Sequence, residues 1–388
     1  MGAILYQRPV HIVAAKRSPI GRFGGGLKGL PAVDLAVQVA APVVAGVEAH
    51  VDSAIFGHVL PAGAGMNLAR QVALKLKLPQ SAPAYTVNMV CGSGLQAVAL
   101  GAAELQLLES QLILVGGAES MSNAPFYDAS TRWGRKYGNF ELSDAILSDG
   151  LTDPGLQIEM GETAERVADL HHVSRADQDA FALASQMKAA AAAAAFEREI
   201  VPIVTAKDPV SRDEHPRADT TLEKLEKLKP AFRPRGTVTA GNASGLNDGA
   251  AALLLAGIES VRAHGLKSRA RIVATCRVGC DPALMGLGPV GAIRGLCEIT
   301  GWNLNEIPAV EINEAFAAQS VACARELGLR DDQINQRGGA IALGHPLGAS
   351  GARVLVTLLH ILEDNGWERG IASLCLGGGM GIAVGVER

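Results

Sequence analysis

Short apolar runs alternate with longer helical segments along the first third of the chain. The short runs resemble buried strands, whereas residues 35–47 and 95–108 repeat their apolar positions every three to four residues, as helices do. The predicted strands are residues 10–15, 54–60, 85–88 and 112–115. This alternation predicts an α/β fold around a mostly buried sheet.

The segment from residue 120 to residue 246 is more polar and less regular. It contains a predicted helix over residues 161–171. A second helix should begin after Ser174, a favourable N-cap, and continue through the seven alanines of residues 189–195. We interpret this segment as an insertion carried on the α/β core.

After residue 245 the alternation of strands and helices resumes. The predicted elements are strands 250–256, 271–277 and 309–312, helices 291–300 and 315–327, and a hairpin of strands 371–376 and 382–386. The chain therefore divides into an N-terminal half (1–119, completed by about 247–268), the insertion (120–246) and a C-terminal half (269–388).

One order of elements occurs near both ends of the chain. A strand leads through the glycine-containing turn 91–94 into helix 95–108, and a strand and a second glycine turn follow. The turn 348–351 leads into helix 352–362 in the same way, again followed by a strand and glycines. This order predicts a duplicated α/β unit; chance use of a common α/β pattern is the alternative.

Composition narrows the class of protein. The chain has 388 residues, of which 48% are hydrophobic and 19% charged, so it can bury a large core. A net charge of −4 argues against a nucleic-acid-binding protein. No apolar run approaches the length of a membrane span, and Arg8, Lys16 and Arg17 interrupt the first one, so a soluble cytoplasmic protein is expected.

The six cysteines are scattered and should be free thiols in a reducing compartment. Cys276 and Cys280 are four residues apart, but no His or Cys pair lies nearby, so no metal site is expected. Cys91 differs because it follows a predicted strand and begins a helix, where backbone N–H groups and the helix dipole favour a thiolate. An inert cysteine in a tight turn is the alternative.

Three other positions could belong to a site with Cys91. His345 lies in a segment dense in glycine and proline, which restricts its backbone; a turn histidine bonded to the main chain is the alternative. Cys375 precedes three glycines whose N–H groups could hold an anion, or that could simply form a hairpin. Asn313 lies between a strand and a helix, as an N-cap or as a donor to a carbonyl.

Four segments together resemble the thiolase family, and specifically its acetyl-CoA acetyltransferase branch, over essentially the whole chain. They are residues 88–94 (Asn-Met-Val-Cys-Gly-Ser-Gly), 313–316 (Asn-Glu-Ala-Phe), 338–346 (ending Gly-His-Pro) and 375–381 (Cys-Leu-Gly-Gly-Gly-Met-Gly). The resemblance implies a five-layer αβαβα core, duplicated, with an inserted loop domain that binds coenzyme A.

The resemblance also implies catalytic roles. Cys91 would take the acyl group from the first acyl-CoA after His345 activates its thiol, and Cys375 would remove an α-proton from the second. Asn313, through a water, and His345 would hold one thioester oxygen. The N–H groups of Cys91 and Gly377 would hold the tetrahedral oxyanion. No metal or redox cofactor is implied.

The positions that match substrate and CoA contacts of the family form a larger set. They are Leu151, Met160, Arg217, Phe232, Ala240, Ser244, Met285, Ala315 and Phe316. Two residues depart from the family pattern: Glu159 replaces a histidine, and Lys224 replaces a serine. The stretch 132–134 with 142–153 resembles a region that pairs dimers, so a homotetramer is expected.

The implied reaction is the reversible condensation of two acetyl-CoA molecules to acetoacetyl-CoA and CoA. A broader degradative 3-ketoacyl-CoA thiolase is the alternative within the family. A non-catalytic acyl-CoA-binding or lipid-binding relative is the alternative of another class, but it should lack a catalytic Cys or His. A carrier-protein ketoacyl synthase should lack the second cysteine, Cys375.

Overall fold

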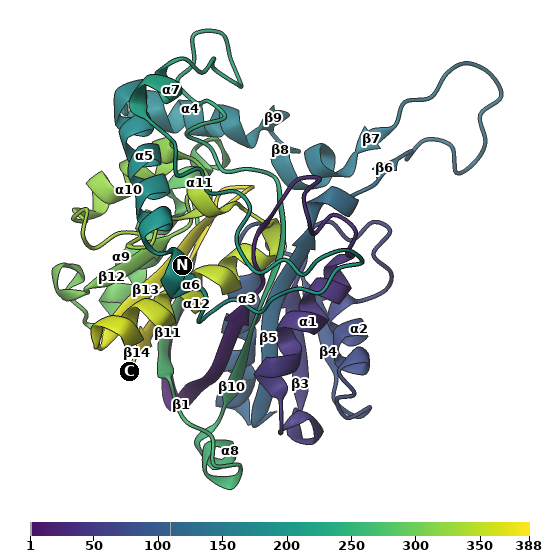
Figure 1. Cartoon of the computed structure of the whole chain (residues 1–388), viewed down its shortest axis with the longest axis vertical. Helices are drawn as coiled ribbons and strands as arrows, with labels where there is room; N and C mark the ends of the chain where they lie inside the picture. The colour runs from purple at the N-terminus through teal and green to yellow at the C-terminus, as the bar shows by residue number, and fades with distance from the viewer. Residues whose placement is uncertain (1, 109) are drawn as a thin grey trace.

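The computed structural model describes residues 2–108 and 110–388. Within them, ten strands form one sheet in the order β12-β13-β14-β11-β1-β10-β5-β3-β4, with β2 beside β10 (Figure 1). The strands are β1 Gly2–Arg17, β2 Gly21–Arg22, β3 Ser53–Gly57, β4 Ala84–Val87, β5 Leu112–Ser120, β10 Asn247–Ala256, β11 Ala270–Gly279, β12 Ala309–Ile312, β13 Arg369–Leu376 and β14 Met380–Glu387.

Helices connect and cover these strands. They are α1 Ala32–Val44, α2 Leu68–Lys75, α3 Ser93–Leu107, α4 Met160–Leu170, α5 Arg175–Ala191, α6 Ala193–Phe196, α7 Leu222–Glu226, α8 Ile258–Ala263, α9 Gly288–Thr300, α10 Ala317–Leu327, α11 Ala340–Leu343 and α12 Leu347–Asn365. None of the helices in the described ranges combines the length and apolar character needed to cross a bilayer.

The two halves of the sheet repeat one pairing pattern. In the N-terminal half β3 is parallel to β5, β5 is antiparallel to β10, and β10 is antiparallel to β1. In the C-terminal half β12 is parallel to β13, β13 is antiparallel to β14, and β14 is antiparallel to β11. The predicted duplication is therefore confirmed, and the antiparallel pair β1–β11 joins the two copies.

Three hydrophobic clusters lie between the layers of helices and strands. The central cluster contains side chains of α3 and α12 and of strands from both halves, such as Leu95, Leu355, Val115 and Leu374. A second cluster packs α1 and α2 on the outer face of the N-terminal half. A third packs α9 and α10 on the outer face of the C-terminal half. The order is thus outer helices, N-terminal half of the sheet, central helices, C-terminal half of the sheet and outer helices, which are the five layers that the resemblance implied.

Close packing in the central layer depends on glycine. A Cβ atom on Gly117 of β5 would lie 2.0 Å from the carbonyl oxygen of Gly348, and one on Gly351 would lie 2.3 Å from the amide nitrogen of Leu95. Side chains at these positions would push α12 away from β5 and α3. The glycines therefore allow the first turns of α3 and α12, which flank Cys91 and His345, to lie against each other.

Several predicted helix boundaries were wrong. The turn predicted at 348–351 lies inside α12, because that helix begins at Leu347 and continues to Asn365. The long alanine helix ends at Ala191, and the separate turn α6 follows it. This break lets Phe196 turn into a cluster with Ile20 and Leu343 of the core. The helix after Asn313 begins at Ala317 and not at residue 315, because Ala315 and Phe316 stay outside it and contact the insertion through Ser244 and Ala243.

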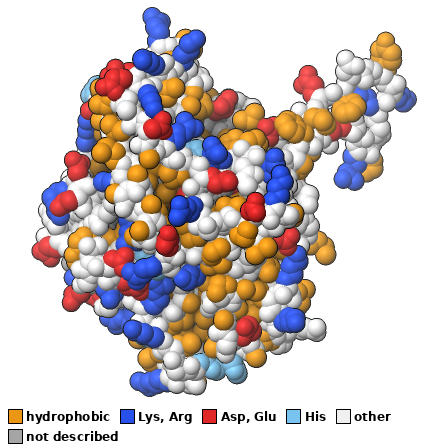
Figure 2. All heavy atoms as spheres, in the orientation of Figure 1, with side chains coloured by type: hydrophobic (Ala, Val, Ile, Leu, Met, Phe, Trp, Pro, Cys, Tyr) orange, Lys and Arg blue, Asp and Glu red, His pale blue; other side chains and the backbone are white. Residues whose placement is uncertain are grey.

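The insertion covers one end of the core. It carries α4, α5, α6 and α7, two short strand pairs, β6 Phe126–Tyr127 with β7 Ser143–Asp144 and β8 Thr152–Asp153 with β9 Ile158–Glu159, and the loops between them. The chain between β6 and β7 forms an arm that projects away from the body (Figure 1). Hydrophobic side chains are visible on this arm (Figure 2).

Candidate active site

A cavity of about 410 Å³ lies where the insertion meets the two halves of the core. Twelve residues singled out in the sequence line it: Cys91, Leu151, Met160, Arg217, Phe232, Ala240, Ser244, Met285, Ala315, Phe316, His345 and Cys375. Asn313 and Gly377 are not part of the lining but directly contact groups that are. The structure therefore brings residues from all three parts of the chain to one place.

The turn that carries Cys91 is tightly constrained. Val90 has a positive φ of 49°, and the hydroxyl of Ser93 donates to the carbonyl oxygen of Val90 (2.6 Å). Gly92 is required here because a Cβ atom on it would lie 2.5 Å from Leu376 Cδ2. The end of β13 can therefore approach the start of α3, which places the turn after β13 beside Cys91.

The thiol of Cys91 is neutral in the free protein. Burial raises the pKa of Cys91 to about 11, and the charge of Glu119 adds to the rise, while hydrogen bonds from the N–H groups of Gly377 and of Cys91 itself act in the opposite direction. The N–H groups at the helix start therefore favour a thiolate, as expected, but desolvation exceeds their effect. Two N–H groups nevertheless converge on the sulfur.

Alkylation of Cys91 tests this protonation state. Below a pKa near 11 the thiolate fraction grows with pH, so the rate of carbamidomethylation by iodoacetamide should rise about tenfold per pH unit from pH 7 to pH 9. Mass spectrometry of the peptide that contains Cys91 separates it from the other five cysteines. A rate that reaches a plateau below pH 8 would instead indicate a preformed thiolate.

Hydrogen bonds fix the orientation and the tautomer of the His345 ring. Its backbone N–H donates to Asn247 Oδ1 (2.9 Å), and its Nδ1 contacts Ser350 Oγ at 2.6 Å. The Ser350 hydroxyl donates to the carbonyl oxygen of Pro346 (2.8 Å), so it must accept from Nδ1–H. Asn313 Nδ2 donates to Nε2 (3.4 Å). The proton thus resides on Nδ1, and the lone pair of Nε2 is directed away from Ser350.

His345 is also kept neutral by its surroundings. Burial first, and then the positive charge of Arg353, lower the pKa of His345 to about 3. The Nε2 lone pair, which accepts from Asn313, is the site on this neutral imidazole that can take a proton from a thiol. The alternative of a turn histidine bonded only to main chain does not hold, because both ring nitrogens contact side chains.

Cys375 lies at the end of β13 and is almost fully buried. Its neighbours in the cluster are apolar and include Met160 and Met285. Burial raises the pKa of Cys375 well above its ordinary value, and a charge on Cys91 raises it further. The charge state of Cys91 therefore influences the ionisation of Cys375.

Asn313 is not an N-cap, since α10 begins at Ala317. Its side chain instead points to His345, and its Oδ1 accepts from Arg353 Nη2 (3.4 Å). Sequence reasoning missed the parts of Ser350 and Arg353. Ser350 lies in the glycine-rich segment that drew attention to His345, and Arg353 comes two residues after it. The contacts of both depend on tertiary packing.

Aromatic and basic side chains line the outer part of the cavity. Phe232 meets Phe316 edge-on with ring centroids 6.1 Å apart. Arg217 and His215 line both this cavity and an adjoining groove that Lys224 also lines. Burial, with the charges of Arg217 and Arg22, lowers the pKa of His215 to about 4.

The two departures from the family pattern lie apart from each other. Glu159 lines the main cavity and is exposed. Lys224 Nζ forms an exposed ion pair with Asp219 (2.5 Å) in the adjoining groove. Neither residue contacts the thiols, so the departures concern the outer cavity and not the reacting groups.

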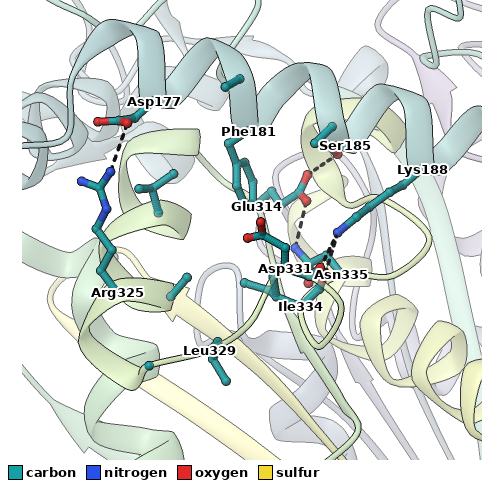
Figure 3. A pocket seen from close by; sticks show the side chains of 15 residues that line it. Asp177, Phe181, Ser185, Lys188, Glu314, Arg325, Leu329, Asp331, Ile334 and Asn335 are labelled. Atoms are coloured by element: carbon teal, nitrogen blue, oxygen red, sulfur yellow. Dashed lines mark hydrogen bonds and ion pairs between the residues drawn. The ribbon is translucent and has the colours of Figure 1, made fainter.

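A second cavity, of about 610 Å³, lies between α5 and α10 (Figure 3). Most of its charged side chains are already engaged. Asp177 pairs with Arg325 (3.1 Å), and the carboxylate of Glu314 accepts from Ser185 Oγ (2.7 Å) and Asn335 Nδ2 (2.9 Å). These bonds anchor the loop that carries Asn313, which gives this region a structural part in the site.

Comparison with known proteins decides the family. Family models of the thiolase N-terminal domain and the thiolase C-terminal domain match residues 10–259 and 266–388. The chain belongs to the thiolase family. The acetyl-CoA acetyltransferase of Chromobacterium violaceum is 48% identical over 389 residues, which cover 98% of this chain and 99% of that protein.

Solved thiolases have the same fold. The crystal structure of the Bacillus anthracis acetyl-CoA acetyltransferase is 44% identical and superimposes with a TM-score of 0.95, covering 99% of this chain and 100% of that one. The human mitochondrial 3-ketoacyl-CoA thiolase in complex with CoA is also 44% identical, with a TM-score of 0.96 and 99% coverage of both chains. The predicted family and thiolase fold are confirmed.

Proposed function

We propose that this thiolase is an acetyl-CoA acetyltransferase that condenses two acetyl-CoA molecules to acetoacetyl-CoA and CoA, and reverses the reaction. The observation that carries the proposal is the convergence of Cys91, His345 and Cys375 on one cavity, with the N–H groups of Cys91 and Gly377 directed at the Cys91 sulfur. This set holds two thiols, a neutral base and an oxyanion site.

In the first half-reaction Cys91 Sγ attacks the thioester carbonyl while His345 Nε2 takes the thiol proton. The developing oxyanion accepts hydrogen bonds from the N–H groups of Cys91 and Gly377. The bond between the carbonyl carbon and the CoA sulfur then breaks. The CoA thiolate leaves with the proton from His345, and an acetyl thioester remains on Cys91.

In the second half-reaction Nε2 of His345 takes the thiol proton of Cys375, and the Cys375 thiolate removes a proton from the α-carbon of a second acetyl-CoA. The resulting enolate oxygen is held by Nε2–H of His345 and, through a water, by Asn313. The carbanion attacks the acetyl carbonyl on Cys91 and the carbon–sulfur bond breaks. The Cys91 thiolate then takes the Nε2 proton of His345, so acetoacetyl-CoA leaves with Cys91 and His345 restored. Every atom and proton is accounted for by these groups, so the proposal includes no metal or redox cofactor.

The outer cavity suits the rest of coenzyme A. Met160, Phe232 and Phe316 provide apolar surface for the pantetheine arm or adenine, and the cation of Arg217 suits a phosphate. Leu151, Ala240, Ser244, Met285 and Ala315 complete the lining. We assign these residues to binding of the CoA thioester.

The proposal extends to assembly and location. Trp133 and Tyr137 on the arm are 94% and 96% exposed, and Phe126, Phe140 and Leu142 are exposed beside them. Apolar surface of this kind favours burial against another copy, which supports a homotetramer. The six free thiols are typical of a reducing compartment such as the cytoplasm.

A broader 3-ketoacyl-CoA thiolase is the second candidate, favoured by the similarity to the human mitochondrial enzyme. Next to Cys91, the side chains of Met121, Leu151, Leu246 and Leu347 form one apolar cluster that limits the space for a long acyl chain. This cluster favours the shorter substrate.

Thiolysis measured across chain lengths tests the choice. We expect kcat/KM for acetoacetyl-CoA to exceed that for C8–C16 3-ketoacyl-CoA by at least about tenfold, since large side chains surround the acyl position. Cys91→Ser, which should lose turnover, controls for background hydrolysis. Strong activity only on the long chains would establish the broader thiolase, and full activity of Cys91→Ser would exclude the proposed mechanism.

A further inference from the structure

Arg353 is a buried cation directly behind the proposed catalytic groups. It lies on α12, two turns after His345, and is 2% exposed. Its Nη2 donates to Asn313 Oδ1 (3.4 Å). Its Nε and Nη1 have no hydrogen-bond partner within the described ranges. Arg353 does not line the cavity, so any effect on the reaction must pass through another residue.

The chemistry of the guanidinium decides which end of the Asn313 amide faces the histidine. A guanidinium only donates hydrogen bonds, so Arg353 must face the amide oxygen of Asn313. The amide nitrogen then faces Nε2 of His345, as observed. Without the cation, rotation of the amide by half a turn would place its oxygen against Nε2 and would favour a proton there.

Hydrogen bonds fix the backbone of Asn313 and of its two neighbours. Its N–H donates to the carbonyl oxygen of Ser373 (3.0 Å). On one side of it, Asn335 binds both the N–H and the carbonyl of Ile312, at 2.8 Å each. On the other side, Glu314 accepts from Ser185 and Asn335 (Figure 3), and also from the N–H of Ile341. Rotation of the side-chain amide is thus the remaining freedom.

We propose that Arg353 is a positioning residue, which acts through Asn313 to keep Nε2 of His345 unprotonated and the Asn313 amide N–H directed toward the site. The proposal rests on the proposed function. The hydrogen bonds then run in one direction, from Arg353 through Asn313, His345 and Ser350 to the carbonyl of Pro346. Burial lowers the pKa of Arg353 and the charge of Glu311 opposes this, but a guanidinium remains charged at neutral pH.

A double-mutant cycle tests the proposal through steady-state thiolysis of acetoacetyl-CoA. Arg353→Met should lower kcat about 10–100-fold, the usual cost of losing an orienting group, with KM for CoA within about twofold. In the Asn313→Ala background the same substitution should change kcat less than about twofold, because the residue it orients is gone. Arg353→Lys retains a cationic donor and should recover part of the loss.

Arg337 offers a matched control. It is also buried, with one unpartnered nitrogen in the described part of the chain, and it binds α12 through Asp364 and the carbonyl of His360. Arg337→Met should lower stability without lowering kcat. If Arg353→Met fails to fold, the cycle is run with Arg353→Lys.

The tautomer of His345 provides a readout that a structural role would not change. In ¹⁵N-histidine-labelled protein the Nε2 signal of His345 should have the shift of an unprotonated nitrogen, and Arg353→Met should move it toward a protonated one. Additive losses in the cycle, or an unchanged tautomer, would overturn the proposal. Those results would leave the proposed function intact. The proposed function itself would be refuted only if the Cys91→Ser variant remained active.

Discussion

Cys375→Ala should transfer an acetyl group from acetyl-CoA to Cys91 and then stop. The first half-reaction uses Cys91 and His345, which the substitution leaves in place, whereas removal of the α-proton has no other thiol in the cavity lining. We expect kcat for condensation and for thiolysis to fall by at least about 10⁴-fold, as for the loss of other essential catalytic groups. Mass spectrometry should show the acetylated peptide of Cys91 accumulating.

Cys276→Ala is the matched control for this experiment. Cys276 is also a fully buried thiol with a raised pKa, but it lies in β11 within the outer cluster of the C-terminal half. Its loss should leave turnover near the wild-type value. Condensation by Cys375→Ala would show that another group takes the α-proton, and absence of the acetylated peptide would show that Cys375 is needed for acylation.

The ionisation of the two thiols supports this order of events. A charge on Cys91 raises the pKa of Cys375, so both cannot easily be thiolates together. Once Cys91 carries an acyl group it can no longer be charged, and deprotonation of Cys375 becomes easier. Acylation of Cys91 would therefore prepare the base for the second half-reaction.

Sequence patterns predicted the layers better than the details of the site. The periodic helices and apolar strands were sufficient for the α/β class and the duplication, because each copy repeats one local order. The glycine-rich turns marked Cys91, His345 and Cys375, since their neighbours must adopt unusual backbone or permit close approach. These features are local, and local features can be found in a sequence.

The partners of these residues could not be predicted, because tertiary packing supplies them. Asn313 follows a strand, as an N-cap would, yet Arg353, 40 positions later, draws its side chain away from the helix. The thiolate expected at Cys91 from its place before α3 is overridden by burial, which depends on the whole cavity. The early start expected for α10 ignored the insertion, which holds Phe316 outside the helix.

Arg17→Met should destabilise the protein by about 3–5 kcal/mol, the usual cost of removing one partner of a buried ion pair. Arg17 is fully buried at the end of β1, where its guanidinium donates to Glu199 (2.9 Å) and to both oxygens of Asp213 (2.7 and 3.0 Å). Methionine fills much of the space but leaves two buried carboxylates without their cation. The free energy of unfolding in urea provides the measurement.

Arg198→Met is the control for loss of a positive charge in the same region. Arg198 pairs with Glu363 (3.8 Å) and with Asp364, but its side chain is 56% exposed, so its loss should cost less than about 1 kcal/mol. Equal losses for the two variants would show that burial of Arg17 contributes nothing.

Loss of Arg17 should also weaken binding of the substrate. Glu199 and Asp213 belong to the insertion, and Asp213 lies two residues before His215 and four before Arg217 in the cavity wall. Arg17 therefore attaches that wall to β1 of the core. Arg17→Met should raise KM for acetoacetyl-CoA more than it lowers kcat, because neither the thiols nor His345 bond to this ion pair. The nearest link is Thr357 of α12, whose hydroxyl donates to Glu199 (3.3 Å).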